Sequence, residues 1–170
     1  MAQAFDLTVN QFIHTLTNVN TILDKAAAHA DHRKFDSNNY VGLRLAPDML
    51  PFAKQIQIAC DSAKGIVRLS GQEVPKHEDT EQTLAELKER VKKTIGVLQA
   101  LKRESFEGWE KKEINLNFPK GKKLPAGEWV PQMVLPNFYF HVSMAYAILR
   151  SAGVELGKSD FLGNVKFQDQ

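Results

Sequence analysis

The stretch LAELKERVKKTIGVLQAL, at residues 84–101, decides the fold class. Its apolar residues recur at spacings of three and four, and these are Leu84, Leu87, Val91, Ile95, Leu98 and Leu101. That spacing places them on one face of an α-helix, while the basic residues from 88 to 93, Arg90 among them, mostly lie on the other faces. We expect Asp79 or Thr80 to cap this helix. A helix with one apolar face packs against other elements, so the stretch predicts a bundle.

Three further stretches have helical spacing, at residues 5–29, 47–69 and 137–152. Gly71 and Gly153 each stand just beyond the last apolar residue of a stretch, where helices commonly stop. Because the connections look short, we expect helices that follow one another in the chain to pack side by side. The sequence therefore predicts one all-α domain over residues 1–170, built as a bundle of four principal helices.

The pattern changes between Gly108 and Pro131. Residues 114–118, INLNF, alternate with period two, and a turn rich in Pro, Gly and Lys separates them from Glu128-Trp129-Val130. Alternation of this kind indicates strands, so we expect a short β-hairpin or irregular excursion before the last helix. We expect the tail at residues 161–163 to cover one end of the bundle.

Composition excludes several classes of protein. The formal net charge is only +2, and basic and acidic residues are interspersed, which argues against a nucleic-acid-binding surface. No stretch approaches the length of a membrane span, and the first residues lack the features of a signal peptide. With Cys60 as the single cysteine, no intrachain disulfide can form, and its apolar neighbours predict a buried thiol. We expect a cytoplasmic protein.

Polar residues interrupt the predicted helix at 47–69. Gln57, Asp61 and Lys64 follow one another at spacings of four and three, so an amide, a carboxylate and an ammonium share one face. Gln55 lies on a neighbouring face. A buried polar group without a partner costs a few kcal/mol, so something must satisfy these side chains. They are candidates for a structural cluster or for binding a small ligand.

Asn137 and His141 present a second polar pair, four residues apart on the last helix. The His141 imidazole could be a metal ligand, a general base or a structural donor. As a structural group we expect it to hydrogen-bond Asp61 or Gln57, since buried polar side chains are normally paired.

His29 and His32 resemble a metal-binding pair at the end of the first helix. Imidazolium is also favoured there by the helix dipole, which gives an ordinary explanation for both residues. His29 or Asp61 could complete a metal site with His141. A Gly-rich phosphate loop, a Gly-x-Ser-x-Gly turn and a His-Glu-x-x-His motif are all absent, which lowers the expectation of a nucleotide enzyme or hydrolase.

Five motifs together resemble one family over nearly the whole chain: LAPDM at 45–49, QIQIACDSAKG at 55–65, DTE at 79–81, LPNFYFH at 135–141 and GKSDFLG at 157–163. The sequence is similar to the domain-of-unknown-function family DUF1993, related to the DinB/YfiT-like helical bundles. The resemblance implies a DinB-like four-helix bundle that is often a homodimer.

The resemblance also implies a site where three histidines hold a divalent metal, one from the second helix and a His-x-x-x-His pair from the last. In this sequence His141 stands at the second position of the pair and Asn137 at the first. Gln55 or Gln57 stands in place of the histidine on the second helix. One imidazole with two amides is a poor site for zinc or nickel, so we expect the usual tri-histidine site to be missing.

Two functions follow from these residues. The first is a bundle whose polar cluster is structural or binds a small molecule. The second, implied by the resemblance, is a metal-dependent small-thiol transferase or hydrolase, with His141 as ligand and Asp61 as ligand or base.

A third hypothesis is a stress-response module that binds a partner. It predicts an exposed apolar patch around Phe106, Trp109 and Trp129. The same aromatic residues could instead pack the excursion onto the bundle, which we favour because aromatic side chains bury large areas.

Overall fold

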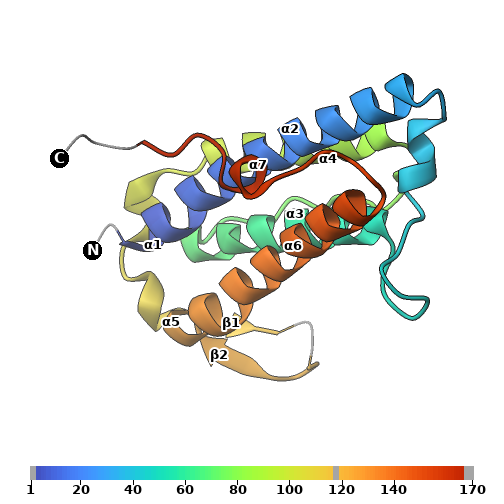
Figure 1. Ribbon diagram of the computed structural model, residues 1–170. Helices are drawn as coiled ribbons and strands as arrows, with labels where there is room; N and C mark the ends of the chain where they lie inside the picture. Colours follow the sequence, from blue (N-terminus) through green and yellow to red (C-terminus); the bar gives the residue numbers. More distant parts are fainter. Residues whose placement is uncertain (1–2, 117–118, 167–170) are drawn as a thin grey trace.

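The structure, a computed structural model, describes residues 3–116 and 119–166. Within them, the long helices are α2 (Gln11–His32), α3 (Phe52–Gly65), α4 (Leu84–Gln99) and α6 (Leu135–Ser151). Shorter elements are the helices α1 (Gln3–Phe5), α5 (Ala126–Trp129) and α7 (Lys158–Leu162) and the strands β1 (Glu113–Asn115) and β2 (Lys123–Pro125). The four long helices form the expected all-α bundle (Figure 1).

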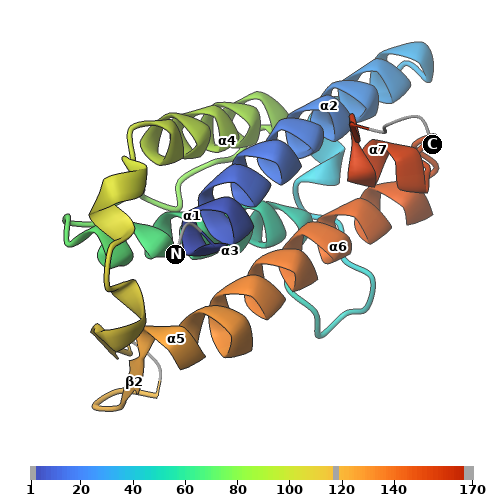
Figure 2. The ribbon, with the colours of Figure 1, turned by 90° about the vertical axis from the view of Figure 1, so that its left-hand side faces the viewer.

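The helices do not pack in chain order, contrary to our expectation. α2 packs along α4, while α3 packs along both α4 and α6. The two helices α2 and α3, successive in the chain, therefore occupy opposite corners of the bundle (Figure 2). The connection at residues 33–51 is long enough to cross the end of the bundle, which a short turn could not do.

α3 begins at Phe52 rather than near Pro47. The preceding loop folds back on the first turn of the helix, where Phe52 N donates to Leu43 O at 2.8 Å and Ala53 N donates to Val41 O at 3.1 Å. These bonds satisfy amides that a helix start leaves without partners. The chain leaves the bundle after residue 70 at Gly71, as expected, with a φ of 78°.

α4 is capped by Thr83, so the expected caps Asp79 and Thr80 were wrong. Thr83 Oγ1 accepts from Glu86 N at 3.2 Å, and Thr83 N donates to the Glu86 carboxylate at 3.0 Å. This reciprocal pair is a capping box. It leaves residues 72–82 as an extended segment along the outside of the bundle.

The expected hairpin is confirmed. β1 and β2 pair antiparallel, with Ile114 opposite Leu124. Residues 117 and 118 of the predicted alternation lie outside the described residues. Glu128-Trp129-Val130 is not a strand, because α5 and the π-helical turn that follows it lead directly into α6. Trp129 and Phe106 are buried and Trp109 is partly buried, so these aromatics pack the excursion onto the bundle.

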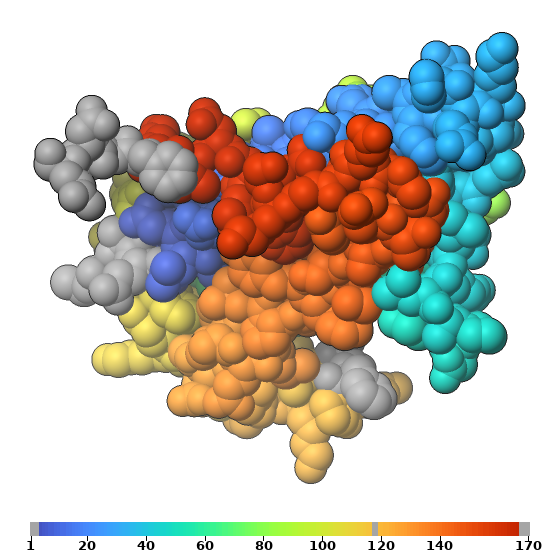
Figure 3. Space-filling view, in the orientation of Figure 1, coloured from blue at the N-terminus to red at the C-terminus, as the bar shows by residue number. Residues whose placement is uncertain are grey.

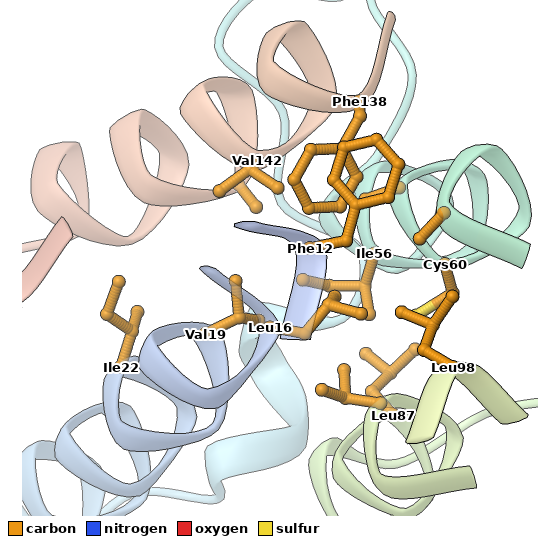
Figure 4. Packing of buried hydrophobic residues seen from close by; sticks show 14 of the residues in the cluster. Phe12, Leu16, Val19, Ile22, Ile56, Cys60, Leu87, Leu98, Phe138 and Val142 are labelled. Carbon is orange, nitrogen blue, oxygen red and sulfur yellow. The ribbon is translucent and has the colours of Figure 1, made fainter. Parts of the chain in front are cut away.

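All four long helices contribute to one apolar core (Figure 4). The rings of Phe12 in α2 and Phe138 in α6 lie 4.2 Å apart between centroids. Cys60 is fully buried, as expected, and burial raises the pKa of its thiol to about 11. The thiol is therefore protonated and acts as a small apolar side chain.

The tail packs along the side of α2 rather than over one end of the bundle. Figure 3 shows this C-terminal segment, in red, between α2 in blue and α6 in orange. Asn18 Nδ2 donates to Phe161 O at 3.1 Å, and Lys25 pairs with Asp160 at 2.6 Å. None of the described helices is both long and apolar enough to cross a membrane.

Candidate functional site

A groove of about 830 Å³ runs between α3, α6 and the segment that precedes α6. Its apolar lining consists of Ile58, Gly65, Leu116, Trp129, Met133, Val134, Pro136 and Phe140. Asp61, Ser62, Arg68, Gln132 and Asn137 supply the polar groups. Grooves of this size, with apolar walls and a few polar groups, are typical of small-molecule sites.

Gly65 shapes the floor of the groove. A Cβ at this position would lie 3.6 Å from Cη2 of Trp129, so the indole rests against the backbone of α3. The guanidinium carbon of Arg68 lies 6.0 Å from the centre of the same ring, within the range of a cation–π contact. Arg68 was not among the sequence candidates, and Trp129 was considered only for a partner-binding patch. The excursion that carries Trp129 has no helical period that relates it to α3.

Asn137 and Asp61 line this groove, so two of the sequence candidates meet there. Asn137 Nδ2 donates to Ser62 Oγ at 2.6 Å, which ties α6 to α3 at the rim. The Asp61 side chain is 47% exposed and adjoins Ser62 in the chain. An amide and a hydroxyl thus meet at the rim of the groove, and a carboxylate also lines it.

His141 is buried and bonds to α3, but to Gln55 rather than to Asp61 or Gln57. Its Nδ1 lies 2.7 Å from Gln55 Oε1, and Gln55 Nε2 donates to Leu50 O at 3.0 Å. Because the Leu50 carbonyl can only accept, it fixes the orientation of the amide. Nδ1 must then carry the proton, and Nε2 of the neutral ring keeps its lone pair. Burial lowers the pKa of His141, which favours this neutral form.

Asp61 and Lys64 belong to an ionic cluster centred on Arg90. The Arg90 side chain is only 2% exposed and pairs with Asp61 at 2.9 Å, Asp79 at 2.9 Å and Glu81 at 3.0 Å. Lys64 Nζ also pairs with Asp61 at 3.0 Å. The cluster joins α3 and α4 to the extended segment at residues 72–82.

Our placement of Arg90 on an outer face of its helix was wrong. It follows Leu87 by three residues and precedes Thr94 by four, and both are buried, so the helical spacing could have revealed it. An arginine at a core position needs acidic partners, and these come from residues 61 to 81, which the local pattern of α4 does not include.

Gln57 is buried beside this cluster. Its Nε2 donates to Glu81 Oε2 at 2.9 Å, while its Oε1 has no hydrogen-bond partner in the structure. Burial raises the pKa of Glu81, but hydrogen bonds from Arg90, the backbone and Gln57 together hold it below the ordinary value. Gln57 and Lys64 therefore help to hold the 72–82 segment, and Lys64 does so through Pro75 O at 3.1 Å.

The candidate metal ligands do not meet. His29 Nδ1 bonds to Tyr40 Oη at 2.6 Å, and the ring lies beside Gly153 at the end of α6. His141 stands twelve residues earlier, about 18 Å along the helix axis. Asp61 stands six residues beyond Gln55, the partner of His141, about 9 Å along α3. Among the described residues, no three His, Cys, Asp or Glu side chains gather closely enough to hold a metal ion.

Comparison with known proteins gives two findings. The family model described as "Domain of unknown function (DUF1993)" matches residues 4–162. A crystal structure of a DinB family member protein from Shewanella denitrificans is 41% identical, covers 98% of this chain and 96% of its own, and superimposes with a TM-score of 0.93. No curated protein matches the sequence.

Proposed function

The chain belongs to the family described as Domain of unknown function (DUF1993), with a DinB-like fold, and from that premise we propose that it binds a small organic molecule in the groove between α3 and α6. The observation that carries the proposal is the groove itself, about 830 Å³ of mostly apolar lining with polar groups at its rim. That volume suits a molecule of ordinary metabolite size.

The polar groups of the groove divide by role. Asn137, Ser62 and Asp61 are positioned to fix the orientation of a bound molecule, since all three line the groove. Gln55 and His141 bond to each other inside the bundle, which supports a structural role for this pair. In this proposal the groove residues contact the bound molecule, while the bond between Gln55 and His141 holds α3 and α6 in place.

The donor set around His141 does not fit a zinc or nickel ion. The amide of Gln55 is engaged with His141 and Leu50, and the amide of Asn137 is engaged with Ser62. Amide oxygens bind these metals weakly compared with imidazole or carboxylate, and the Asp61 carboxylate is held by two cations. This chemistry supports a ligand-binding function over a metal-dependent transferase or hydrolase.

A substitution that fills the groove tests the proposal. Gln132 is exposed and lines the groove, so Gln132→Trp should block it without disturbing the core. Gln72→Trp places the same side chain on an exposed loop and is the matched control. In a thermal-shift screen of small organic fragments, those that raise the Tm of the native protein and of Gln72→Trp should leave Gln132→Trp unchanged. Fragments that stabilise all three proteins equally, or none of them, would contradict the proposal.

A homodimer and a cytoplasmic location remain predictions. The first is implied by the resemblance to the DinB/YfiT-like bundles, and sedimentation of the purified protein tests it. The second follows from the sequence and is tested by fractionating the native cell.

A further inference from the structure

The geometry points to an anionic ligand: the groove molecule carries a single negative group, such as a carboxylate, that pairs with Arg68. This inference rests on the proposed function and adds the chemical class of the ligand. Arg68 lines the groove beside Trp129, at the end next to β1, and it also lines an adjoining hollow of about 580 Å³.

Arg68 is held in place by a backbone carbonyl and an aromatic ring. Its Nη1 donates to Asn115 O at 3.2 Å, and its guanidinium lies against the Trp129 ring. In the part of the chain that the structure describes, no carboxylate lies within ion-pair distance of Arg68, whereas Arg90 has three such partners. A guanidinium has five N–H donors in a planar fork suited to a carboxylate. Arg68 therefore offers a positioned cation with donors to spare.

The charge around Arg68 reinforces this preference. Lys112 lines the adjoining hollow and donates to Leu69 O. Glu113 lines it too, but this carboxylate is neutralised by Lys123 at 2.7 Å. The local balance is positive, so an anion entering this end gains Coulomb energy while a cation loses it.

The opposite end of the groove sets the size of the ligand. Asp61 lies in α3, and Arg68 lies seven residues later in the 3-10 helix Ile66–Ser70 that continues it, about 12 Å along the axis. The charge of Asp61 is already balanced by Arg90 and Lys64, so it does not repel an anion bound at Arg68. Apart from Ser62, Gln132 and Asn137, the lining between Asp61 and Arg68 is apolar. The fitting ligand is an amphipathic anion with a mostly apolar body about 10 Å long, which fits within that distance.

Sodium octanoate and 1-octanol form a matched pair of probes that differ in the charged group. Trp109→Phe removes the second tryptophan, so fluorescence in that background reports on Trp129 in the groove. We expect octanoate to bind about tenfold more tightly than octanol, because a charge-assisted pair exceeds a neutral hydrogen bond. The preference should weaken as salt is added.

Arg68→Met should bring octanoate binding down to that of octanol in the same variant, and Arg68→Lys should retain part of the preference. Arg150→Met, at an exposed arginine in the last turn of α6, is the charge-matched control and should keep the full preference. Unfolding midpoints of each variant separate loss of the cation from loss of the fold. Equal binding of the two probes, or a preference that survives in a folded Arg68→Met, overturns the anionic ligand while groove binding stands. Failure of both probes to bind overturns this inference and counts against the proposed function.

Discussion

Nδ1 of His141 lies 2.7 Å from the amide oxygen of Gln55, so two of the three positions that the family resemblance associates with metal-binding histidines are bonded directly to each other. The resemblance left Gln55 and Gln57 as alternatives for the position of the family's histidine on the second helix, α3. Gln55 is the one that faces His141, whereas Gln57 bonds to Glu81. A hydrogen bond thus links α3 to α6 at this position.

Replacing Gln55 with Leu should destabilise the fold by about 1–3 kcal/mol, because it leaves the buried Nδ1–H of His141 without an acceptor. Urea unfolding of the variant measures this loss. Gln72→Leu, on an exposed loop, is the control and should change little. A Gln55→Leu protein as stable as the native one would show that the bond contributes nothing.

The pH dependence of stability should reflect the buried imidazole of His141 and the partly buried imidazole of His77. Burial lowers the folded-state pKa of His141 and of His77 from the ordinary 6.5, so the unfolded chain binds protons that the folded chain excludes. Stability should therefore fall as the pH drops below about 6.5 toward the folded pKa values. His141→Gln should make the fall in stability shallower. His77→Gln should remove the separate contribution of that imidazole to the fall, and the double variant should remove the contributions of both. Urea titrations at several pH values give the slopes, and identical slopes for His141→Gln and the native protein would refute the assignment.

Arg90→Met should be the most destabilising of these changes. It leaves Asp61, Asp79 and Glu81 close together without their shared cation, and we expect a loss of about 3 kcal/mol, near the lower end for buried pairs because two of these carboxylates are partly exposed. The segment at residues 72–82 should also become sensitive to proteolysis. Arg150→Met serves as control, and a segment that resists cleavage in Arg90→Met would contradict this account.

Gly163→Ala should detach α7 from α2. Gly163 has a φ of 66°, and a Cβ there would overlap the amide of Asn18. Gly121→Ala is the matched control, because its φ is 77° and a Cβ there would have no atom of the described residues within 4 Å. We expect Gly163→Ala to lose about 1–2 kcal/mol more than the control, since overpacking adds to the same backbone strain. Faster hydrogen exchange at residues 158–162 in Gly163→Ala alone would verify that α7 detaches. Equal losses of unfolding free energy in the two variants would argue against the contact between Gly163 and Asn18.

Helical spacing predicted the four long helices and the glycine after residue 70, because those signals are local. The start of α3 was missed since Pro47 and Pro51 both suit a helix start, and the choice is made by hydrogen bonds to Val41 and Leu43 in a folded loop. The order of the helices around the bundle was missed for a similar reason. That order depends on how the connection at residues 33–51 crosses the bundle, and the spacing of apolar residues does not indicate it.

The candidate site was predicted in part. Asp61 and Lys64 do share a face and form an ion pair, as the spacing indicated. Arg90, which pairs with Asp61, comes from another helix, and Trp129, which follows the hairpin far along the chain, lies beside Arg68. Contacts between distant segments are fixed by packing, so a single sequence cannot specify them.

The central claim is that the groove beside Trp129 binds a small organic molecule. The most direct test is the indole N–H signals of Trp109 and Trp129 in a two-dimensional NMR spectrum, assigned by single substitution to Phe and recorded during titration with octanoate. Trp129 lines the groove and Trp109 does not, so the account predicts a saturable shift of the Trp129 signal and a stationary Trp109 signal. A stationary Trp129 signal at saturating octanoate, or equal drift of both signals, would contradict it.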